Sequence, residues 1–384
     1  MDERTYDLLT PEEISSGTAT AAYFLRTEEI LDYLDENPTV VAEMSAPEAW
    51  TVLTGVKDAA RLLEGKPIDV YAPPPGTVVS GGPVLRIEGP YRSFARFESP
   101  LLGFLSHASG VATAAMESRA AARDRTVLSF GTRRQHPVLG AMIERAAHIG
   151  GVDGIGNVAG GELIGVEAGG TMPHSLVICL GDAERAFRAF NEALDEDIPR
   201  TMLTDTFCDE AQEALLAAET LGDDLDAVRL DTTASRRGDM RAIIEEVRWA
   251  LDQHGHDGVD ILVSGGVDAA MVDRLRDVAD GFGIGSAIAN ADPVDLSMNI
   301  VEVDGTPRSK RGVRAGAKQV YRDGLDDTVV SVDETAAGEP LLEPLIEDGD
   351  IVREFSLDEA RARVLETIPA LRERGAFQWQ ASDS

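Results

Sequence analysis

The sequence contains few cysteines and few cations. Its only two cysteines, Cys179 and Cys208, support neither a disulfide framework nor a cysteine zinc site. Both lie in apolar or helical stretches, so we expect buried, inert thiols. Lys and Arg number 35 against 68 Asp and Glu, which gives a net charge near −33. Such a charge makes binding to nucleic acid or to an anionic membrane electrostatically unfavourable.

Long apolar runs are also lacking. No stretch reaches the roughly 20 apolar residues of a membrane span, and the acidic residues 1–13 contain no apolar core of a signal peptide. We therefore expect a cytoplasmic protein. The acidity is spread along the whole chain, which suits a salt-rich cytoplasm, and a halophilic source is our hypothesis. No internal repeat or heptad series indicates a solenoid or a coiled coil.

The chain length of 384 residues and the hydrophobic content of 43% allow two packed domains. Alternating apolar residues and tight turns over 70–92 predict short antiparallel strands. Further along, strand-like runs at 127–130, 201–207, 227–231 and 260–266 alternate with helices predicted over 137–149, 182–194, 208–221, 238–253 and 267–279. This alternation indicates parallel pairing and favours an α/β barrel over a doubly wound sheet. We expect domains over 1–110 and 111–295, with 296–384 returning to the first.

Polar side chains and glycines follow four of the predicted strands, where α/β barrels carry their active sites. They are Gly131, Thr132, Arg133, Arg134, Gln135 and His136 after the first, Asp205 and Thr206 in the second, Asp231 after the third, and Ser264, Gly265 and Gly266 after the fourth. Singly, each has an ordinary explanation as a solvated arginine, a helix cap or a turn. Together they predict an anion-binding rim, since cations are scarce elsewhere.

Two further features extend this rim. A glycine-bearing turn over 280–288 places Gly283, Gly285 and Ser286 where backbone N–H groups could hold a phosphate, as in the turn over 264–268. His174 follows a glycine-rich turn and precedes an apolar run that we interpret as a strand, so we expect its imidazole at a strand edge. A purely structural histidine remains the alternative.

Six strings are similar to a known family in order and spacing. They are SFGTRR (129–134), GNVAGG with GTMPHS (within 156–175), TDTF (204–207), VRLD (228–231), SGGVD (264–268) and FGIGS (282–286). Over 23–322 the chain resembles archaeal-type nicotinate phosphoribosyltransferases, of the type II phosphoribosyltransferase family. The resemblance implies an N-terminal α/β sandwich and an irregular α/β barrel, in a homodimer or higher homo-oligomer whose active sites are completed across the subunit interface.

The resemblance also implies roles for individual residues. The nicotinate ring would lie between Phe130 and Tyr23 of the partner subunit, with Arg229 beside its carboxylate. Arg133 would contact phosphoribosyl pyrophosphate, and Asp231 would orient the ribose, while Mg²⁺ would neutralise the departing pyrophosphate. Thr132 and Asp205 complete the expected substrate site. The implied phosphate-binding residues are Ser264, Gly265, Gly266, Gly283, Gly285 and Ser286.

His174 occupies the position of the family's phosphorylatable histidine, which implies that ATP is a co-substrate hydrolysed through a phosphohistidine. Nicotinamide-using relatives carry an acidic residue near Gly156 and Asn157, so this chain should prefer the anion nicotinate. Two departures are Ala21, where an acidic residue is expected, and the missing cysteine-rich tail of some archaeal-type members. The first affects the base pocket, and the second excludes a zinc tail.

Other functions compete with this interpretation. A quinolinate- or nicotinamide-type phosphoribosyltransferase would share the fold, although the dicarboxylate quinolinate should require more basic residues. A phosphate-binding barrel lyase or isomerase would share the glycine turns but would not need Phe130, Arg133 and His174 together. A non-catalytic metabolite-binding protein is the last alternative.

Overall fold

The computed structural model describes residues 6–377 and 379. The chain divides into two compact units. The first contains the residues up to Thr113 and Asp292–Arg374, and the second contains Ala114–Ala291 with the residues from Gly375 on. The boundary falls within the long helix α4 (Glu98–Ala122). Among the described residues, no helix is long and apolar enough to cross a membrane.

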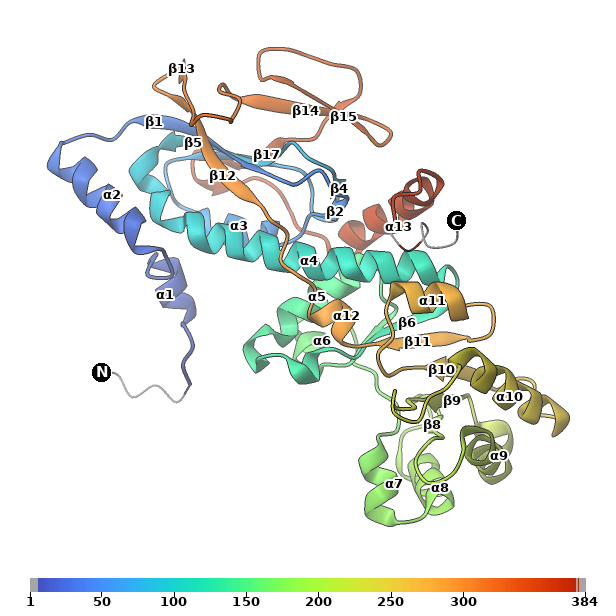
Figure 1. Cartoon of the computed structure of the whole chain (residues 1–384). Coiled ribbons are helices and arrows are strands. Elements are labelled where there is room, and N and C mark those ends of the chain that lie inside the picture. The colour runs from blue at the N-terminus through green and yellow to red at the C-terminus, as the bar shows by residue number, and fades with distance from the viewer. Residues whose placement is uncertain (1–5, 378, 380–384) are drawn as a thin grey trace. The chain divides into compact units, whose positions relative to one another are not determined.

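The first unit is organised by a seven-stranded antiparallel sheet in the order β13-β12-β1-β5-β3-β17-β18. These strands are β1 (Thr39–Ser45), β3 (Asp69–Ala72), β5 (Pro83–Pro90), β12 (Ser297–Val303), β13 (Thr306–Pro307), β17 (Glu343–Glu347) and β18 (Asp350–Ile351). Chain segments from both ends therefore share one sheet, with β12 beside β1 in Figure 1. The hydrophobic core includes α3 (Val56–Leu63), whose apolar side chains are buried with those of the sheet.

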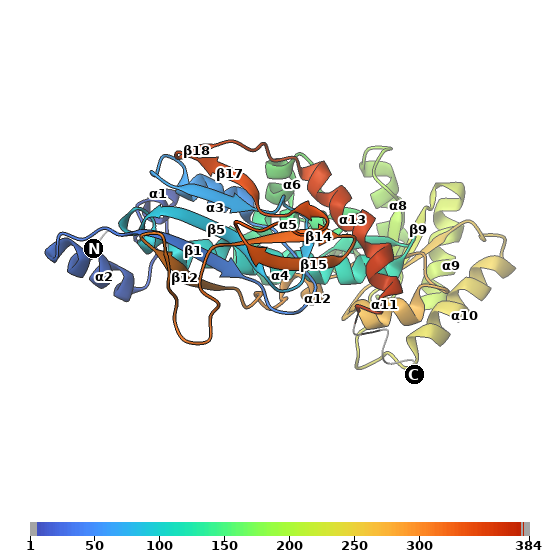
Figure 2. The same cartoon turned by 90° about the horizontal axis from the view of Figure 1, so that it is seen from above.

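The other elements of the first unit are short or peripheral. They are α1 (Pro11–Ser15), α2 (Ala22–Tyr33), the pair β2 (Thr51–Val52) and β4 (Val78–Val79), the 3₁₀ turns Tyr91–Ser93 and Ala95–Phe97, the sheet of β14 (Lys318–Asp323), β15 (Asp326–Ser331) and β16 (Glu339–Pro340), and α13 (Leu357–Glu373). In the view of Figure 2, β14 and β15 lie close to β5 and β17. Lys318 begins β14, and its buried ammonium donates to the Glu43 carboxylate of β1.

The second unit contains a six-stranded parallel sheet in the order β7-β6-β11-β10-β9-β8. Its strands are β6 (Thr126–Ser129), β7 (Gly154–Ile155), β8 (Thr201–Leu203), β9 (Ala227–Leu230), β10 (Asp260–Val263) and β11 (Gly281–Ile284). Within the described residues β7 and β8 form its two edges, so the sheet is a half-barrel. The predicted α/β fold with an irregular barrel is confirmed.

Helices connect these parallel strands, and one more helix follows the last of them. The connecting helices are α5 (Gly140–Gly150), α6 (Val158–Ile164), α7 (His174–Leu180), α8 (Ala183–Ala193), α9 (Glu210–Leu221), α10 (Met240–Gln253) and α11 (Ala269–Leu275), and α12 (Ser286–Ala289) follows β11. Aspartates cap the N-termini of four of them, namely Asp182, Asp209, Asp239 and Asp268. Each cap accepts a backbone N–H of the first turn, which explains where these helices begin.

Three sequence-based expectations were wrong. The apolar run after Pro173 is helix α7, so His174 begins a helix and does not stand at a strand edge. A run of five apolar residues does not distinguish the two structures, and here Val177 is buried whereas Ile178 is exposed. Cys179 and Cys208 are exposed, because they lie on the outer side of α7 and in the loop before α9.

The third correction concerns residues 280–288. Gly283 lies inside β11, and α12 begins at Ser286, so only Gly285 stands in the expected turn. Gly283 is required by packing, because a Cβ there would lie 2.4 Å from the Phe130 ring. Gly283 therefore lies in a strand and not in a turn, whereas its role in phosphate binding stays a prediction.

Candidate active site

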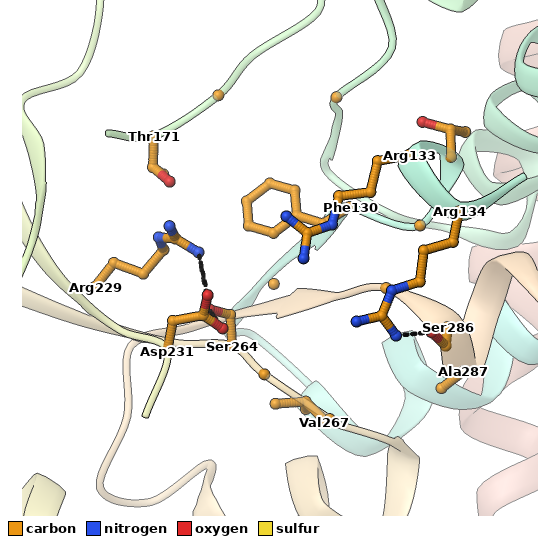
Figure 3. A pocket seen from close by; sticks show the side chains of 18 of the residues that line it. Phe130, Arg133, Arg134, Thr171, Arg229, Asp231, Ser264, Val267, Ser286 and Ala287 are labelled. Carbon is orange, nitrogen blue, oxygen red and sulfur yellow. Dashed lines mark hydrogen bonds and ion pairs between the residues drawn. The ribbon is translucent and has the colours of Figure 1, made fainter. Parts of the chain in front are cut away.

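A cavity of about 680 Å³ opens at the carboxyl edge of the half-barrel (Figure 3). Loops after β6, β9, β10 and β11 supply most of its wall. The predicted residues that line it are Phe130, Thr132, Arg133, Arg229, Asp231, Ser264, Gly265, Gly266, Gly283, Gly285 and Ser286. The structure thus gathers in one place residues that lie more than a hundred positions apart in the sequence.

Phe130 provides an aromatic wall of this cavity. Its backbone N–H donates to the carbonyl of Ile284 (2.8 Å), which continues the pairing of β6 with β11. The ring rests against Gly283, the one residue type that leaves room for it there. Gly156 lies beside the ring as well, since a Cβ at that position would be 3.8 Å from the Phe130 Cδ1. A flat apolar ligand could stack here.

Arg229 is the buried cation of the cavity, with 9% of its surface exposed. Its Nη1 donates to the Ser264 hydroxyl (3.0 Å), and its Nη2 donates to the Met172 carbonyl (3.1 Å). The guanidinium carbon lies 5.9 Å from the centre of the Phe130 ring, and Figure 3 shows both side chains facing the same space. Burial lowers the pKa of Arg229. A guanidinium held this way is a partner for a ligand carboxylate.

Arg133 and Arg134 extend from the loop after β6 and add positive charge opposite Arg229 (Figure 3). Arg134 donates to the Ser286 hydroxyl (3.2 Å), so it also anchors the start of α12. Gly131 allows this close approach, because a Cβ there would lie 2.2 Å from the Ala289 Cβ. In an acidic protein, three arginines facing one cavity favour a polyanionic ligand.

The loop after β10 has the backbone of an anion-binding turn. Gly265 and Gly266 have φ values of 86° and 79°, a backbone conformation that residues other than glycine rarely adopt. A Cβ at Gly265 would also lie 2.7 Å from an Asp231 carboxylate oxygen. Arg237 donates to the Gly265 carbonyl (3.0 Å) and fixes the loop from outside. Successive backbone N–H groups in such turns suit phosphate oxygens.

His174 and Asp205 do not line this cavity, but His174 adjoins Asp231, which does, and its Nε2 faces both carboxylates. Its Nε2 lies 3.6 Å from an Asp231 oxygen and 3.7 Å from an Asp205 oxygen, and its Nδ1 lies 3.3 Å from the Thr206 hydroxyl. Asp205 accepts the Asp231 backbone N–H (3.0 Å), and its other oxygen is buried without a hydrogen-bond partner in the described residues. Burial raises the pKa of Asp205 to about 6, against the opposing attraction of His174.

Asp231 links the histidine to the arginine. It accepts the Ser264 hydroxyl (3.0 Å), and its other oxygen lies 3.6 Å from an Arg229 nitrogen. The dashed line between Arg229 and Asp231 in Figure 3 marks this ion pair. The Asp231 side chain is 25% exposed, so one carboxylate oxygen can still contact a ligand hydroxyl or a hydrated cation.

Tyr23 belongs to a different unit from the other predicted site residues. It lies on α2 of the first unit and is 60% exposed. Its assigned contact with a nicotinate ring of a partner subunit stays a prediction.

Several cavity residues were not singled out from the sequence. They are Gly169, Gly170, Thr171, Pro173, Val267, Asp268 and Ala287. Most occur inside the strings that carry the family resemblance, so those strings contained the signal. Thr206 was named only as a strand-end residue, and its place beside His174 depends on a loop geometry that spacing does not reveal.

No group of three or more metal-ligating side chains occurs in the part of the chain that the structure describes. A half-barrel of parallel strands with glycine turns, arginines and a carboxylate at its carboxyl edge defines a phosphate-binding α/β-barrel protein.

Comparison with known proteins narrows this class. The family models for the N-terminal and C-terminal domains of quinolinate phosphoribosyl transferase match residues 21–109 and 111–299. A nicotinate phosphoribosyltransferase of Mycobacterium tuberculosis is 32% identical over 327 residues, which cover 79% of this chain and 69% of that protein. The Bacillus subtilis nicotinate phosphoribosyltransferase is 28% identical over 56% of this chain and 44% of its own.

Solved structures agree with these matches. The nicotinate-nucleotide pyrophosphorylase of Pyrococcus furiosus superimposes with a TM-score of 0.94 and 46% identity, covering 96% of this chain and 99% of that one. Human nicotinic acid phosphoribosyltransferase shares the fold, with a TM-score of 0.72, 21% identity and coverage of 91% and 93%. The chain belongs to the type II phosphoribosyltransferase family, in which its similar curated relatives are nicotinate phosphoribosyltransferases.

Proposed function

We propose that this protein is a nicotinate phosphoribosyltransferase, which forms nicotinate mononucleotide and pyrophosphate from nicotinate and phosphoribosyl pyrophosphate in NAD biosynthesis. The observation that carries the proposal is a single cavity in which the Phe130 ring and the buried Arg229 adjoin the Gly265–Gly266 turn. An aromatic surface and a fixed guanidinium suit an aromatic carboxylate, and the turn suits a phosphate.

The cavity favours an anionic base over a neutral one. Gly156 presents no side chain beside Phe130, so no carboxylate stands there to repel nicotinate. Arg229 already donates to Ser264 and Met172, which fixes its planar fork toward the base. Tyr23 of the partner subunit would cover the opposite ring face in a homo-oligomer, a role that the exposure of its ring supports.

The expected chemistry is displacement at the anomeric carbon of the ribose by the pyridine nitrogen. Positive charge develops on the sugar as pyrophosphate leaves, and Asp231 is placed to stabilise that charge and to orient the ribose hydroxyls. Arg133 would bind the pyrophosphate oxygens. Mg²⁺ usually binds through one or two carboxylates together with substrate phosphates, and the partly exposed Asp231 fits that pattern. The ion would supply further neutralisation of the leaving group.

His174 is the proposed acceptor of the ATP γ-phosphate. Asp205 and Asp231 face its Nε2, which favours a proton on that nitrogen and leaves the lone pair on Nδ1. Nδ1, which faces the Thr206 hydroxyl, is then the nitrogen that would attack the γ-phosphorus. Hydrolysis of the phosphohistidine would then draw the reaction toward nucleotide.

One assay tests the proposal. Purified protein with Mg²⁺, ATP and labelled phosphoribosyl pyrophosphate is given nicotinate, nicotinamide or quinolinate in separate reactions. We expect nucleotide from nicotinate, and its absence would refute the proposal. The variant His174→Ala should lose the dependence on ATP while slow synthesis without ATP remains. Equal rates of the unmodified protein with and without ATP would contradict the phosphohistidine step.

A quinolinate-type activity is the second candidate. The match to quinolinate phosphoribosyl transferase domains favours it, and Arg133, Arg134 and Arg229 could share two carboxylates. Release of carbon dioxide from quinolinate in the same assay would identify this activity.

A further inference from the structure

Glu213 is a buried carboxylate next to the site whose function the proposed reaction does not explain. It lies in the first half of α9 and is 1% exposed. A carboxylate at such a position loses most of its hydration, so it persists only where protein donors replace water. The donors here come from one short loop, residues 204–208, which leads from β8 into α9.

Three consecutive backbone N–H groups of that loop converge on Glu213. Its Oε2 accepts the N–H of Thr206 (2.7 Å), and its Oε1 accepts those of Phe207 (2.6 Å) and Cys208 (3.0 Å). Bonds from N–H groups to a carboxylate are among the stronger hydrogen bonds in proteins. One side chain therefore fixes the backbone of three of the five loop residues.

The same loop carries the groups that face His174. The Thr206 hydroxyl lies 3.3 Å from its Nδ1, and an Asp205 oxygen lies 3.7 Å from its Nε2. Asp205 is also fixed from the other side, because it accepts the Asp231 N–H. Thr206 depends on Glu213 for its backbone position, so the contact with Nδ1 depends on Glu213 too.

We propose that Glu213 is a positioning residue of this enzyme, which holds the 204–208 loop so that Thr206 and Asp205 orient the His174 imidazole. Within the described residues, Glu213 makes no hydrogen bond to His174 and does not line the cavity, so it would act through the loop. The proposal rests on the role given to His174 under the proposed function. In this proposal the buried Glu213 sets the orientation of the His174 ring, although Glu213 itself takes no part in binding or catalysis.

The variant Glu213→Gln tests this role. The glutamine keeps the size of the side chain but turns one acceptor into an N–H₂ group that faces backbone donors. We expect kcat of the ATP-supported reaction to fall about tenfold or more, as when a partner that orients a functional group is lost, while KM for nicotinate stays within about twofold because Phe130 and Arg229 are untouched. The control Glu219→Gln makes the same charge change at an exposed position of α9 and should leave both constants unaltered.

A second measurement requires no activity. In protein labelled with ¹⁵N-histidine, the ring nitrogens of His174 report its tautomer and hydrogen bonds, with assignment by the spectrum of His174→Gln. Glu213→Gln should shift these signals, and Glu219→Gln should not. If Thr206→Val, which removes only the hydroxyl, shifts the same signals, the path runs through Thr206.

Unchanged His174 signals and an unchanged kcat in Glu213→Gln would overturn the inference. If the unmodified protein forms no nucleotide but Glu213→Gln still shifts the His174 signals, the proposed function fails and the positioning role stands. If Glu213→Gln does not fold, Thr206→Val is measured in its place, because it leaves all three hydrogen bonds from the loop N–H groups to Glu213 intact. Unshifted His174 signals in that variant would equally overturn the inference.

Discussion

Replacing Gly283 by alanine should weaken nicotinate binding through the Phe130 ring. The added Cβ would lie 2.4 Å from Cε2 and 2.5 Å from Cδ2 of that ring, and 3.2 Å from the Ser264 Cβ. Ordinary carbon contacts are about 3.5–4.0 Å, so the ring or the strand must move by about 1 Å. The ring is the freer group because it borders the cavity, whereas β11 is buried and paired on both sides.

The size of the effect follows from the interactions at risk. A stacked aromatic pair contributes about 0.5–1.5 kcal/mol beyond its buried area, so KM for nicotinate should rise roughly 2- to 12-fold. Overpacking should also lower the free energy of unfolding by about 1–3 kcal/mol. The KM for phosphoribosyl pyrophosphate should change less, because the added Cβ overlaps the Phe130 ring at 2.4 Å but approaches Ser264, next to the Gly265–Gly266 turn, only to 3.2 Å.

The assay is steady-state kinetics with one substrate varied at a time, together with urea unfolding. Gly281→Ala is the matched control, since it adds a methyl group two residues earlier in the same strand, at 3.2 Å from Leu262 and Thr126 atoms and away from the Phe130 ring. It should cost stability without raising KM for nicotinate. If Gly283→Ala raised only the KM for phosphoribosyl pyrophosphate, or neither constant, the assignment of Phe130 as the base wall would be refuted.

Four other outcomes are expected. Burial raises the pKa of Asp205 to about 6. Its protonated form therefore contributes stability that is present below about pH 4 and is lost as the pH rises through about 6. In denaturant titrations at pH 8, Asp205→Asn should have a free energy of unfolding at most about 3 kcal/mol above that of the unmodified protein, and this difference should shrink toward pH 4. Arg229→Lys should raise KM for nicotinate about tenfold, because a single ammonium does not reproduce the fork; an unchanged KM would remove Arg229 from the base site. Gly265→Ala, with a Cβ 2.7 Å from Asp231 and a φ of 86°, should raise KM for phosphoribosyl pyrophosphate, and equal kinetics would exclude the turn from phosphate binding. If the acidic surface is an adaptation to salt, activity and unfolding midpoint should both increase with molar KCl, whereas a decline would refute the halophilic hypothesis.

The parallel half-barrel could be predicted because its strands are short, apolar and followed by helices with aspartate caps. Such caps and runs are local, so the sequence carries them directly. The edge at which Phe130, Asp231 and Gly265 meet also follows from parallel pairing alone, since all carboxyl ends share one edge. The roles expected of these three residues rest on the family resemblance, and the structure shows which side chains and backbone groups contact each of them.

Three features lay beyond sequence reasoning for separate physical reasons. The apolar run after His174 is short, so its pattern fits a helix and a strand equally well, and the chain makes it a helix that ends at the left-handed Gly181. Gly283 resembled a turn residue because the Phe130 ring that excludes a side chain comes from a distant strand. Glu213 resembles any solvated helix glutamate, because its donors belong to a loop whose path is not encoded in spacing.

The position of β6 between β11 and β7 has a consequence for the synthesis of the protein. β6 is made early, yet one of its two neighbours, β11, pairs Gly281 with Thr126 and leaves the ribosome much later. The wall formed by Phe130 and Gly283 is therefore absent from every nascent chain that ends before β11. Ligands of the cavity, added during refolding, should therefore stabilise the last stages of folding and not the first.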